Sequence, residues 1–193
     1  EIETAFQRML RQIPANGSLI TCADNHALSL KPHALSKVTT YGFADHADWR
    51  IEITAQENGL THANVHHQKT DWGNFSTHLV GKHNLQNALA ALVAAATLHV
   101  PQKTIANALH TFKGVRRRME IFLEANGITF VDDFAHHPTA IRETILAAKM
   151  RWPQARIRVL FEPRSNTTAT NRFQQELTEA FHDAHQVYLG PIY

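Results

Sequence analysis

The chain has 193 residues, of which 44% are hydrophobic and 19% are charged, an ordinary balance for a globular protein. Its formal net charge of +2 is too small to favour nucleic acid or a membrane surface as a partner, and no apolar run approaches the ~20 residues that span a bilayer. The single cysteine, Cys22, excludes an internal disulfide and agrees with a reducing compartment, so we expect a cytoplasmic protein.

The first part of the chain is predicted to combine short strands with amphipathic helices in an α/β arrangement. Apolar residues at helical spacing predict a helix over residues 1–13, and the Asn58–Gly59 pair predicts a hairpin between strands at 49–54 and 60–65. The other elements expected here are strands at 18–22, 37–41 and 75–80, a short helix after the turn at 24–25, a long helix that opens within 81–87 and ends near 99, and a helix at 101–112.

A different order of elements begins at Met119. A hairpin about Asn126–Gly127 is expected first. The elements predicted in this part are strands at 121–124 and 128–131, a helix at 138–150, a strand at 156–161, a helix at 170–181 and a strand at 186–189. This β-α-β-α-β order predicts a parallel sheet with right-handed crossovers. Because the chain starts at Glu1 and ends as a third parallel strand closes, we expect a segment of a longer protein.

Two carboxylates follow the second strand of that hairpin. The segment TFVDDFAHHPT places Asp132 and Asp133 at the carboxyl end of a strand, shortly before the helix that starts at Pro138. Ligands of open α/β sheets bind at this edge, and carboxylates there can accept hydrogen bonds from sugar hydroxyls. The alternative is that the two acids only cap the turn and the helix.

A run of three arginines, Arg116, Arg117 and Arg118, lies between Gly114 and the hairpin. Guanidinium groups bind phosphate bidentately and stay charged, and a segment that joins two domains borders a preferred kind of ligand site. Successive residues point in different directions, so at most two of the three reach one ligand. A solvated basic surface is the alternative interpretation.

The start of the long helix carries amide side chains. Asn84 and Asn87 are three residues apart and share a helix face, and each offers a donor and an acceptor, as the edge of a purine requires. His83 lies at the helix boundary, where it can stack or donate. The alternative is that the asparagines cap the helix and the histidine is an ordinary surface residue.

A further polar loop follows the strand at 156–161. Arg164, Ser165 and Asn166 lie at its carboxyl end, where an arginine suits the carboxylate of an incoming substrate, and an ordinary polar loop is the alternative. The adjacent pairs His66–His67 and His136–His137 do not have the usual zinc-ligand spacing, and neither HExxH nor CxxC occurs, so we expect no metal site and keep His136 as a ligand contact. No GxxxxGK[ST] phosphate loop is present, so such a loop would lie outside this segment.

Four motifs occur together in a fixed order: GKHNLQNALAALVAA, GVRRRMEI, VDDFAHHPTAI and FEPRSN. In this order and at these intervals they resemble the Mur ligases, the ATP-dependent amide-forming enzymes of bacterial cell-wall synthesis. The resemblance covers essentially the whole chain and is strongest from residue 81 to residue 166. The last two motifs look most like the murein peptide ligases within that family, which join UDP-N-acetylmuramate to the recycled tripeptide L-alanyl-γ-D-glutamyl-meso-diaminopimelate.

The resemblance implies the domain organisation. Residues 1–118 would form the later part of a central ATP-binding domain, and residues 119–193 the first part of a C-terminal Rossmann-like domain that brings the amine substrate. The enzyme would use ATP and Mg²⁺, with the phosphate loop, the Mg²⁺ ligands and the UDP-sugar site outside this segment. The segment by itself would then be inactive.

The resemblance also implies residue roles. The residues assigned in this way are, for adenine, His83, Asn84 and Asn87; for the ribose, Asp133; for the γ-phosphate, Arg118 with Arg117 as the second candidate; and for the tripeptide, His136, Arg164, Ser165 and Asn166. In the implied reaction, ATP phosphorylates the lactyl carboxylate of the sugar, and the peptide amine then attacks the acyl phosphate.

Three alternatives stay open. An L-alanine-adding Mur ligase would be expected to carry Tyr-Gly in place of Phe134 and Ala135, and His-Arg-Tyr in place of residues 164–166. A non-catalytic nucleotide-binding module would lack the phosphate loop upstream of Glu1. A folate polyglutamate-forming ligase would differ in the amine that it accepts.

Overall fold

The computed structural model describes residues 2–57, 59–163 and 173–191. The chain divides into two compact units: an N-terminal unit of residues 1–78 and 84–112, and a C-terminal unit of residues 79–83 and 113–193. All three residues of the Arg116–Arg118 run therefore belong to the C-terminal unit. In the described part of the chain, no helix is long and apolar enough to cross a membrane.

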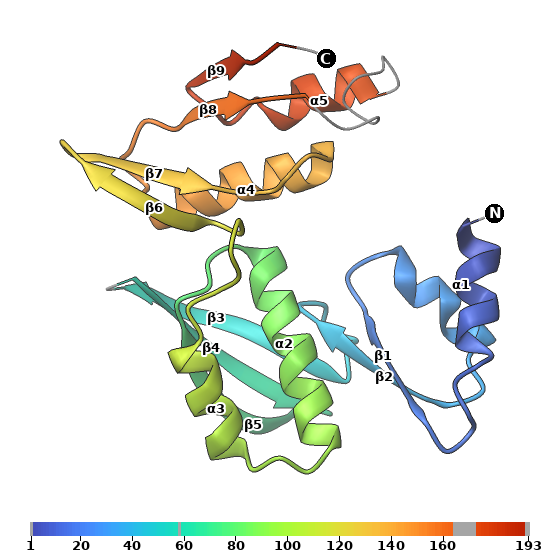
Figure 1. Ribbon diagram of the computed structural model, residues 1–193. Helices are drawn as coiled ribbons and strands as arrows, with labels where there is room; N and C mark the ends of the chain where they lie inside the picture. Colours follow the sequence, from blue (N-terminus) through green and yellow to red (C-terminus); the bar gives the residue numbers. More distant parts are fainter. Residues whose placement is uncertain (1, 58, 164–172, 192–193) are drawn as a thin grey trace. The chain divides into compact units, whose positions relative to one another are not determined.

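A five-stranded sheet forms the centre of the N-terminal unit (Figure 1). Its strands, in spatial order, are β1 (Ser18–Cys22), β2 (Lys37–Gly42), β3 (Trp49–Glu57), β4 (Leu60–His67) and β5 (Thr70–Thr77). Neighbours from β1 to β3 pair in parallel, and neighbours from β3 to β5 pair antiparallel. The helices are α1 (Ile2–Leu10), the 3-10 helix η1 (His26–His33), α2 (Lys82–Thr97) and α3 (Gln102–Thr111).

Most buried side chains of this unit belong to the antiparallel strands and to helix α2. Ile51 of β3 and Val65 of β4 are register partners, and both side chains are fully buried, as the alternation of apolar and polar residues predicts. Leu85, Leu89 and Leu92 form the buried stripe of α2, because residues three and four apart share one helix face.

The hairpin between β4 and β5 differs from the sequence prediction. The strands end and begin at His67 and Thr70, whereas the pattern predicted strands at 60–65 and 75–80. Gln68 and Lys69 form the two-residue turn with φ angles of 49° and 67°. Left-handed turns of this type usually contain Asn or Gly, so nothing in the local sequence marks this one.

The C-terminal unit contains two small sheets and two helices (Figure 1). Its elements are β6 (Glu120–Ala125), β7 (Ile128–Asp132), α4 (Pro138–Arg151), β8 (Arg158–Phe161), α5 (Gln174–Ala180) and β9 (Gln186–Leu189). β6 and β7 form the predicted hairpin, and β8 pairs in parallel with β9. The predicted α/β class is thus confirmed, but within the described residues β7 pairs with β6 and not with β8.

Helix α4 packs against residues of both small sheets. Ala147 packs with Val80 and Met119, and Val131 of β7 packs against this cluster. Ile141 and Ile145 instead pack with α5 and with residues of β8. The hairpin and the parallel pair therefore bind different residues of α4, and each sheet gains its apolar cover from that helix.

Candidate functional site

Asp133 organises the loop that follows β7. Its Oδ2 accepts a hydrogen bond from the Met119 backbone N–H at 2.9 Å, and its Oδ1 accepts one from the Ala135 N–H at 2.8 Å. The carboxylate therefore joins the residue before β6 to the residues after β7. This is the turn-capping role that the sequence left open for Asp133, while the helix cap of α4 is His137. Each carboxylate oxygen retains a lone pair with which it can accept a ligand hydroxyl.

The ring of Phe134 lies among the basic side chains of this unit. The Arg117 and Arg118 guanidinium carbons lie 4.9 Å and 6.0 Å from its centroid, and the His136 ring meets it edge-on at 5.1 Å. The Phe134 N–H donates to the Arg117 carbonyl at 2.9 Å. Cation–π attraction therefore orients both guanidinium groups. Sequence reasoning missed this role of Phe134, whose only local signal is a large aromatic residue in an otherwise polar loop.

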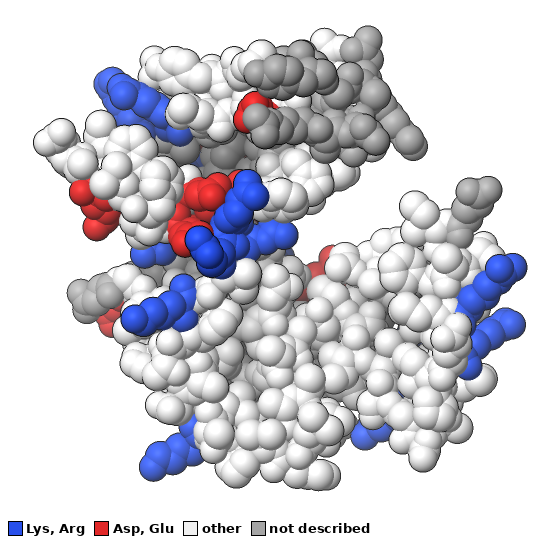
Figure 2. Space-filling model, viewed as in Figure 1, with Lys and Arg blue, Asp and Glu red and all other residues white. Residues whose placement is uncertain are grey.

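Arg117 and Arg118 differ in how they are held. The Arg117 Nε lies 3.3 Å from Asp132 Oδ2, and its backbone N–H donates to Glu120 Oε2 at 2.7 Å with φ at 56°. Figure 2 shows basic side chains (blue) directly against acidic ones (red) in this unit. Among the described residues, no ion pair engages Arg118. Arg118 is therefore better placed than Arg117 to offer its charge to a phosphate.

His83 belongs to this unit and not to the unit of the two asparagines. Burial is the main cause that lowers the pKa of His83, and the charge of Arg118 lowers it further, while Glu143 and Asp133 act in the opposite direction. Among the described residues its Nδ1 is buried without a hydrogen-bond partner. The imidazole is therefore neutral near pH 7 and lies within electrostatic range of Arg118 and Asp133.

We expect His83 to make the C-terminal unit sensitive to acid. Because the folded-state pKa lies below the unfolded value, the unfolded chain binds the proton first as the pH falls, and stability drops from about pH 6.5 downward. Chemical denaturation at pH 7.5 and pH 5 measures how much the free energy of unfolding falls between the two pH values. This decrease should be smaller in His83→Gln than in the wild type. The exposed His182 is the matched control. An equal decrease of the unfolding free energy in the wild type, His83→Gln and His182→Gln would show that His83 does not cause the acid sensitivity.

The predicted adenine contacts on α2 differ in accessibility. Asn84 is only 8% exposed, whereas Asn87, one turn later, is exposed. Only Asn87 therefore has an open amide edge for a base in this conformation. The adenine role of His83, Asn84 and Asn87 stays a prediction.

The remaining predicted ligand contacts are located as follows. His136 is exposed, and its Nδ1 lies 3.0 Å from the Phe134 carbonyl oxygen. Arg164, Ser165 and Asn166 lie outside the described residues. In the described ranges, no group of three His, Cys, Asp or Glu side chains is placed to hold a metal ion.

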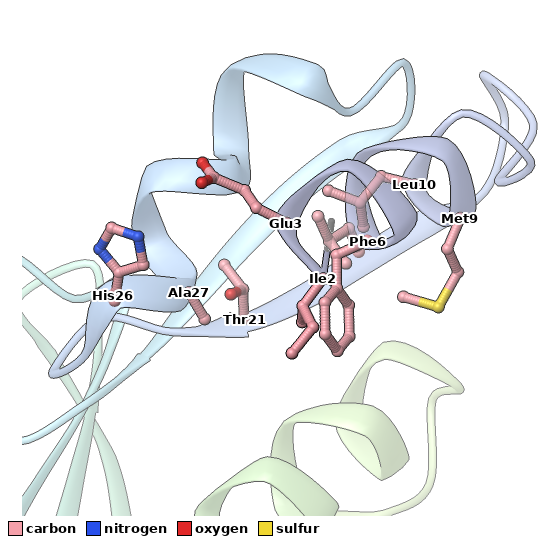
Figure 3. A pocket seen from close by; sticks show the side chains of 9 residues that line it. Ile2, Glu3, Phe6, Met9, Leu10, Thr21, His26 and Ala27 are labelled. Atoms are coloured by element: carbon pink, nitrogen blue, oxygen red, sulfur yellow. The ribbon is translucent and has the colours of Figure 1, made fainter. Parts of the chain in front are cut away.

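A pocket of 530 Å³ lies beside α1 in the N-terminal unit (Figure 3). Ile2, Phe6 and Met9 point into it from one side of the helix, and most of the lining is apolar. None of the lining residues is a predicted site residue. The pocket therefore does not coincide with the candidate nucleotide contacts.

Two family models match the chain: the Mur ligase middle domain over residues 1–95, and the Mur ligase glutamate ligase domain over residues 117–190. Similar curated proteins include the UDP-N-acetylmuramate–L-alanine ligases of Desulforapulum autotrophicum and Geobacter sulfurreducens, each 35% identical over 100% of this chain. The chain spans 42% of the length of either relative.

Solved structures share the fold. The UDP-N-acetylmuramate–alanine ligase of Thermotoga maritima matches with a TM-score of 0.79 over 99% of this chain and 41% of that chain, at 24% identity. A murein peptide ligase of Psychrobacter arcticus matches at 32% identity with a TM-score of 0.65, over 97% of this chain and 40% of that chain. The murein peptide ligase resemblance thus has a structural counterpart, whereas the two curated relatives named above are L-alanine ligases.

Proposed function

Because this chain belongs to the Mur ligase family, we propose that the full-length protein uses ATP to form an amide bond on UDP-N-acetylmuramate. The attacking amine is the α-amino group of L-alanine. It is present in free L-alanine and at the amino end of L-alanyl-γ-D-glutamyl-meso-diaminopimelate. We place the reaction in the cytoplasm. The observation that carries the proposal is the grouping of Arg118 and Asp133 around His83 and Phe134 in one unit.

The chemistry requires activation of a carboxylate. A lactyl carboxylate oxygen attacks the γ-phosphorus of ATP, the bond to ADP breaks, and an acyl phosphate forms. The amine then attacks the acyl carbon, loses a proton, and expels inorganic phosphate. Arg118 offers its positive charge, which no carboxylate of the described residues pairs with, to the transferring phosphoryl group, whose negative charge spreads over its oxygens.

The two acceptors have different support. The two curated relatives favour free L-alanine, and we take that acceptor as the first candidate. The tripeptide is the second candidate, because the chain is 32% identical to a murein peptide ligase and carries Phe134 and Ala135 where an L-alanine ligase is expected to carry Tyr-Gly.

The acceptor can be identified with the full-length protein. Equal concentrations of L-alanine and tripeptide would be supplied separately with UDP-N-acetylmuramate and Mg·ATP, and products would be identified by mass spectrometry. Ligation of L-alanine supports the first candidate, and ligation of the tripeptide alone supports the second. Ligation of neither, with ATP still bound, would favour a non-catalytic nucleotide-binding module. A separate reaction with folate, glutamate and Mg·ATP tests the folate-ligase alternative, which ligation of glutamate to folate would favour.

We also expect the 193-residue chain alone to be inactive. It contains no GxxxxGK[ST] phosphate loop, so this usual binding site for the ATP phosphates is missing from it. Phosphate release and amide formation should both stay at the level of a no-protein blank. ATP-dependent ligation by this chain alone would contradict the proposed division of the site.

A further inference from the structure

Asp24 joins three elements of the N-terminal unit. It follows β1, and its carboxylate accepts two backbone hydrogen bonds. The Phe43 nitrogen lies 2.8 Å from Oδ2 and 3.0 Å from Oδ1, and the Ala44 nitrogen lies 2.8 Å from Oδ1. The side-chain amide of Gln86, on α2, donates to Oδ2 at 2.6 Å. One carboxylate therefore holds the carboxyl ends of two parallel strands and the start of α2 together.

The residues around Asp24 leave room for its hydrogen bond with Gln86. A Cβ on Gly42 would lie 2.5 Å from Asp24 Oδ1, so a larger residue at this position would push the carboxylate away. The buried Cys22 Sγ lies 3.7 Å from the same Gln86 amide nitrogen. Burial is the main cause that raises the pKa of Tyr41, and the neighbouring Cys22 and Asp24 add to it, so the phenol stays neutral beside the carboxylate.

Gln86 lies directly before Asn87 in the first turns of α2. Its hydrogen bond to Asp24 fixes the rotation of these turns relative to the strand ends, because both partners are anchored: the carboxylate by two backbone N–H groups, and the glutamine by the helix. Asn87 is the exposed amide that is predicted to face adenine. Small displacements of a positioning group are costly, since a shift of about 1 Å can lower activity by about 100-fold.

We propose that the Asp24–Gln86 hydrogen bond is a positioning contact for nucleotide binding, which sets the direction in which Asn87 presents its amide. This inference rests on the proposed function, because it assumes that ATP binds at α2. Neither Asp24 nor Gln86 touches the nucleotide. Both act through the orientation of the helix.

A matched pair of variants separates positioning from stability. Gln102 of α3 makes the same kind of contact elsewhere, since its side-chain amide donates to the Trp72 carbonyl at 2.6 Å. In the full-length protein, Gln86→Ala should raise the Kd for Mg·AMP-PNP by about tenfold, because Asn87 is then no longer held in the direction in which it meets the base. Gln102→Ala should leave that Kd within about twofold, and it should lower Tm no more than Gln86→Ala, because its bond is exposed and its acceptor is uncharged.

Reversing the polarity of the pair supplies a rescue test. Asp24→Asn can still accept the Phe43 and Ala44 N–H groups, but it turns an amide N–H₂ toward the Gln86 amide, so the Kd should rise as in Gln86→Ala. Adding Gln86→Glu restores a donor–acceptor pair with the direction reversed. The double variant should therefore recover most of the affinity.

The outcomes distinguish this inference from the proposed function. If the wild type binds Mg·AMP-PNP and Gln86→Ala binds it equally well, the positioning role is wrong while the ligase proposal stands. If Gln102→Ala weakens binding as much as Gln86→Ala, the effect is one of general stability and the inference is again wrong. If the wild type binds no nucleotide, the proposed function fails first.

Discussion

Replacing Arg118 with alanine is expected to lower kcat of the full-length ligase by about 100- to 1000-fold, the usual cost of removing one transition-state stabiliser. No carboxylate of the described residues forms an ion pair with Arg118, and its guanidinium carbon lies 6.0 Å from the centroid of the exposed Phe134 ring. Because Arg118 is proposed to act on the phosphoryl group while it is being transferred, KM for ATP should change much less than kcat.

The neighbouring Arg116 offers the matched control. It is exposed, carries the same charge and lies in the same segment, so Arg116→Ala changes the net charge equally. We expect its kcat to stay within a factor of about three, since exposed charges contribute little on their own. Steady-state rates of phosphate release and product formation measure both variants, and a wild-type kcat in Arg118→Ala would remove Arg118 from the mechanism.

Replacing Asp133 with alanine is expected to destabilise the C-terminal unit by about 2 kcal/mol, because two partly buried backbone N–H groups lose a charged acceptor. The adjacent Asp132 is the control. It pairs with Arg117 at the surface, with 43% and 59% of the two side chains exposed, so Asp132→Ala should cost less than about 1 kcal/mol.

Amide hydrogen exchange locates the Asp133 effect. The Met119 and Ala135 amides should lose protection in Asp133→Ala and retain it in Asp132→Ala, because only Asp133 accepts from them. Unchanged protection of both amides in Asp133→Ala would show that the carboxylate does not organise the loop.

Those elements of the fold that depend on residues adjacent in the sequence could be predicted. The β6–β7 hairpin follows from Asn126 and Gly127, whose φ angles of 52° and 74° suit these residue types. The β4–β5 turn was not predictable, because Gln68 and Lys69 adopt left-handed angles without the usual residue types. The prediction that β7 joins the parallel sheet was wrong for the described residues, because strand pairing is a tertiary contact that the periodicity of a single strand does not contain.

The candidate site shows the same limit. Asp133 and Arg118 were singled out by the resemblance to the Mur ligases, whereas the sequence itself indicated only a pair of acids after a strand and a run of three arginines before a hairpin, which are local features. It did not indicate that Asp133 binds the Met119 N–H, 14 residues away, or that Asp24 binds Gln86 across 62 residues. Contacts of this range depend on how strands and helices pack, so only coordinates reveal them.

The most direct test of the proposed ligation is to follow the oxygen that leaves with phosphate. UDP-N-acetylmuramate labelled with ¹⁸O in its lactyl carboxylate would be incubated with the full-length protein, Mg·ATP and L-alanine or the tripeptide, and the released phosphate analysed by mass spectrometry. Activation as an acyl phosphate predicts that each phosphate carries one carboxylate-derived oxygen. Unlabelled phosphate, formed alongside the amide product or without it, would contradict the account.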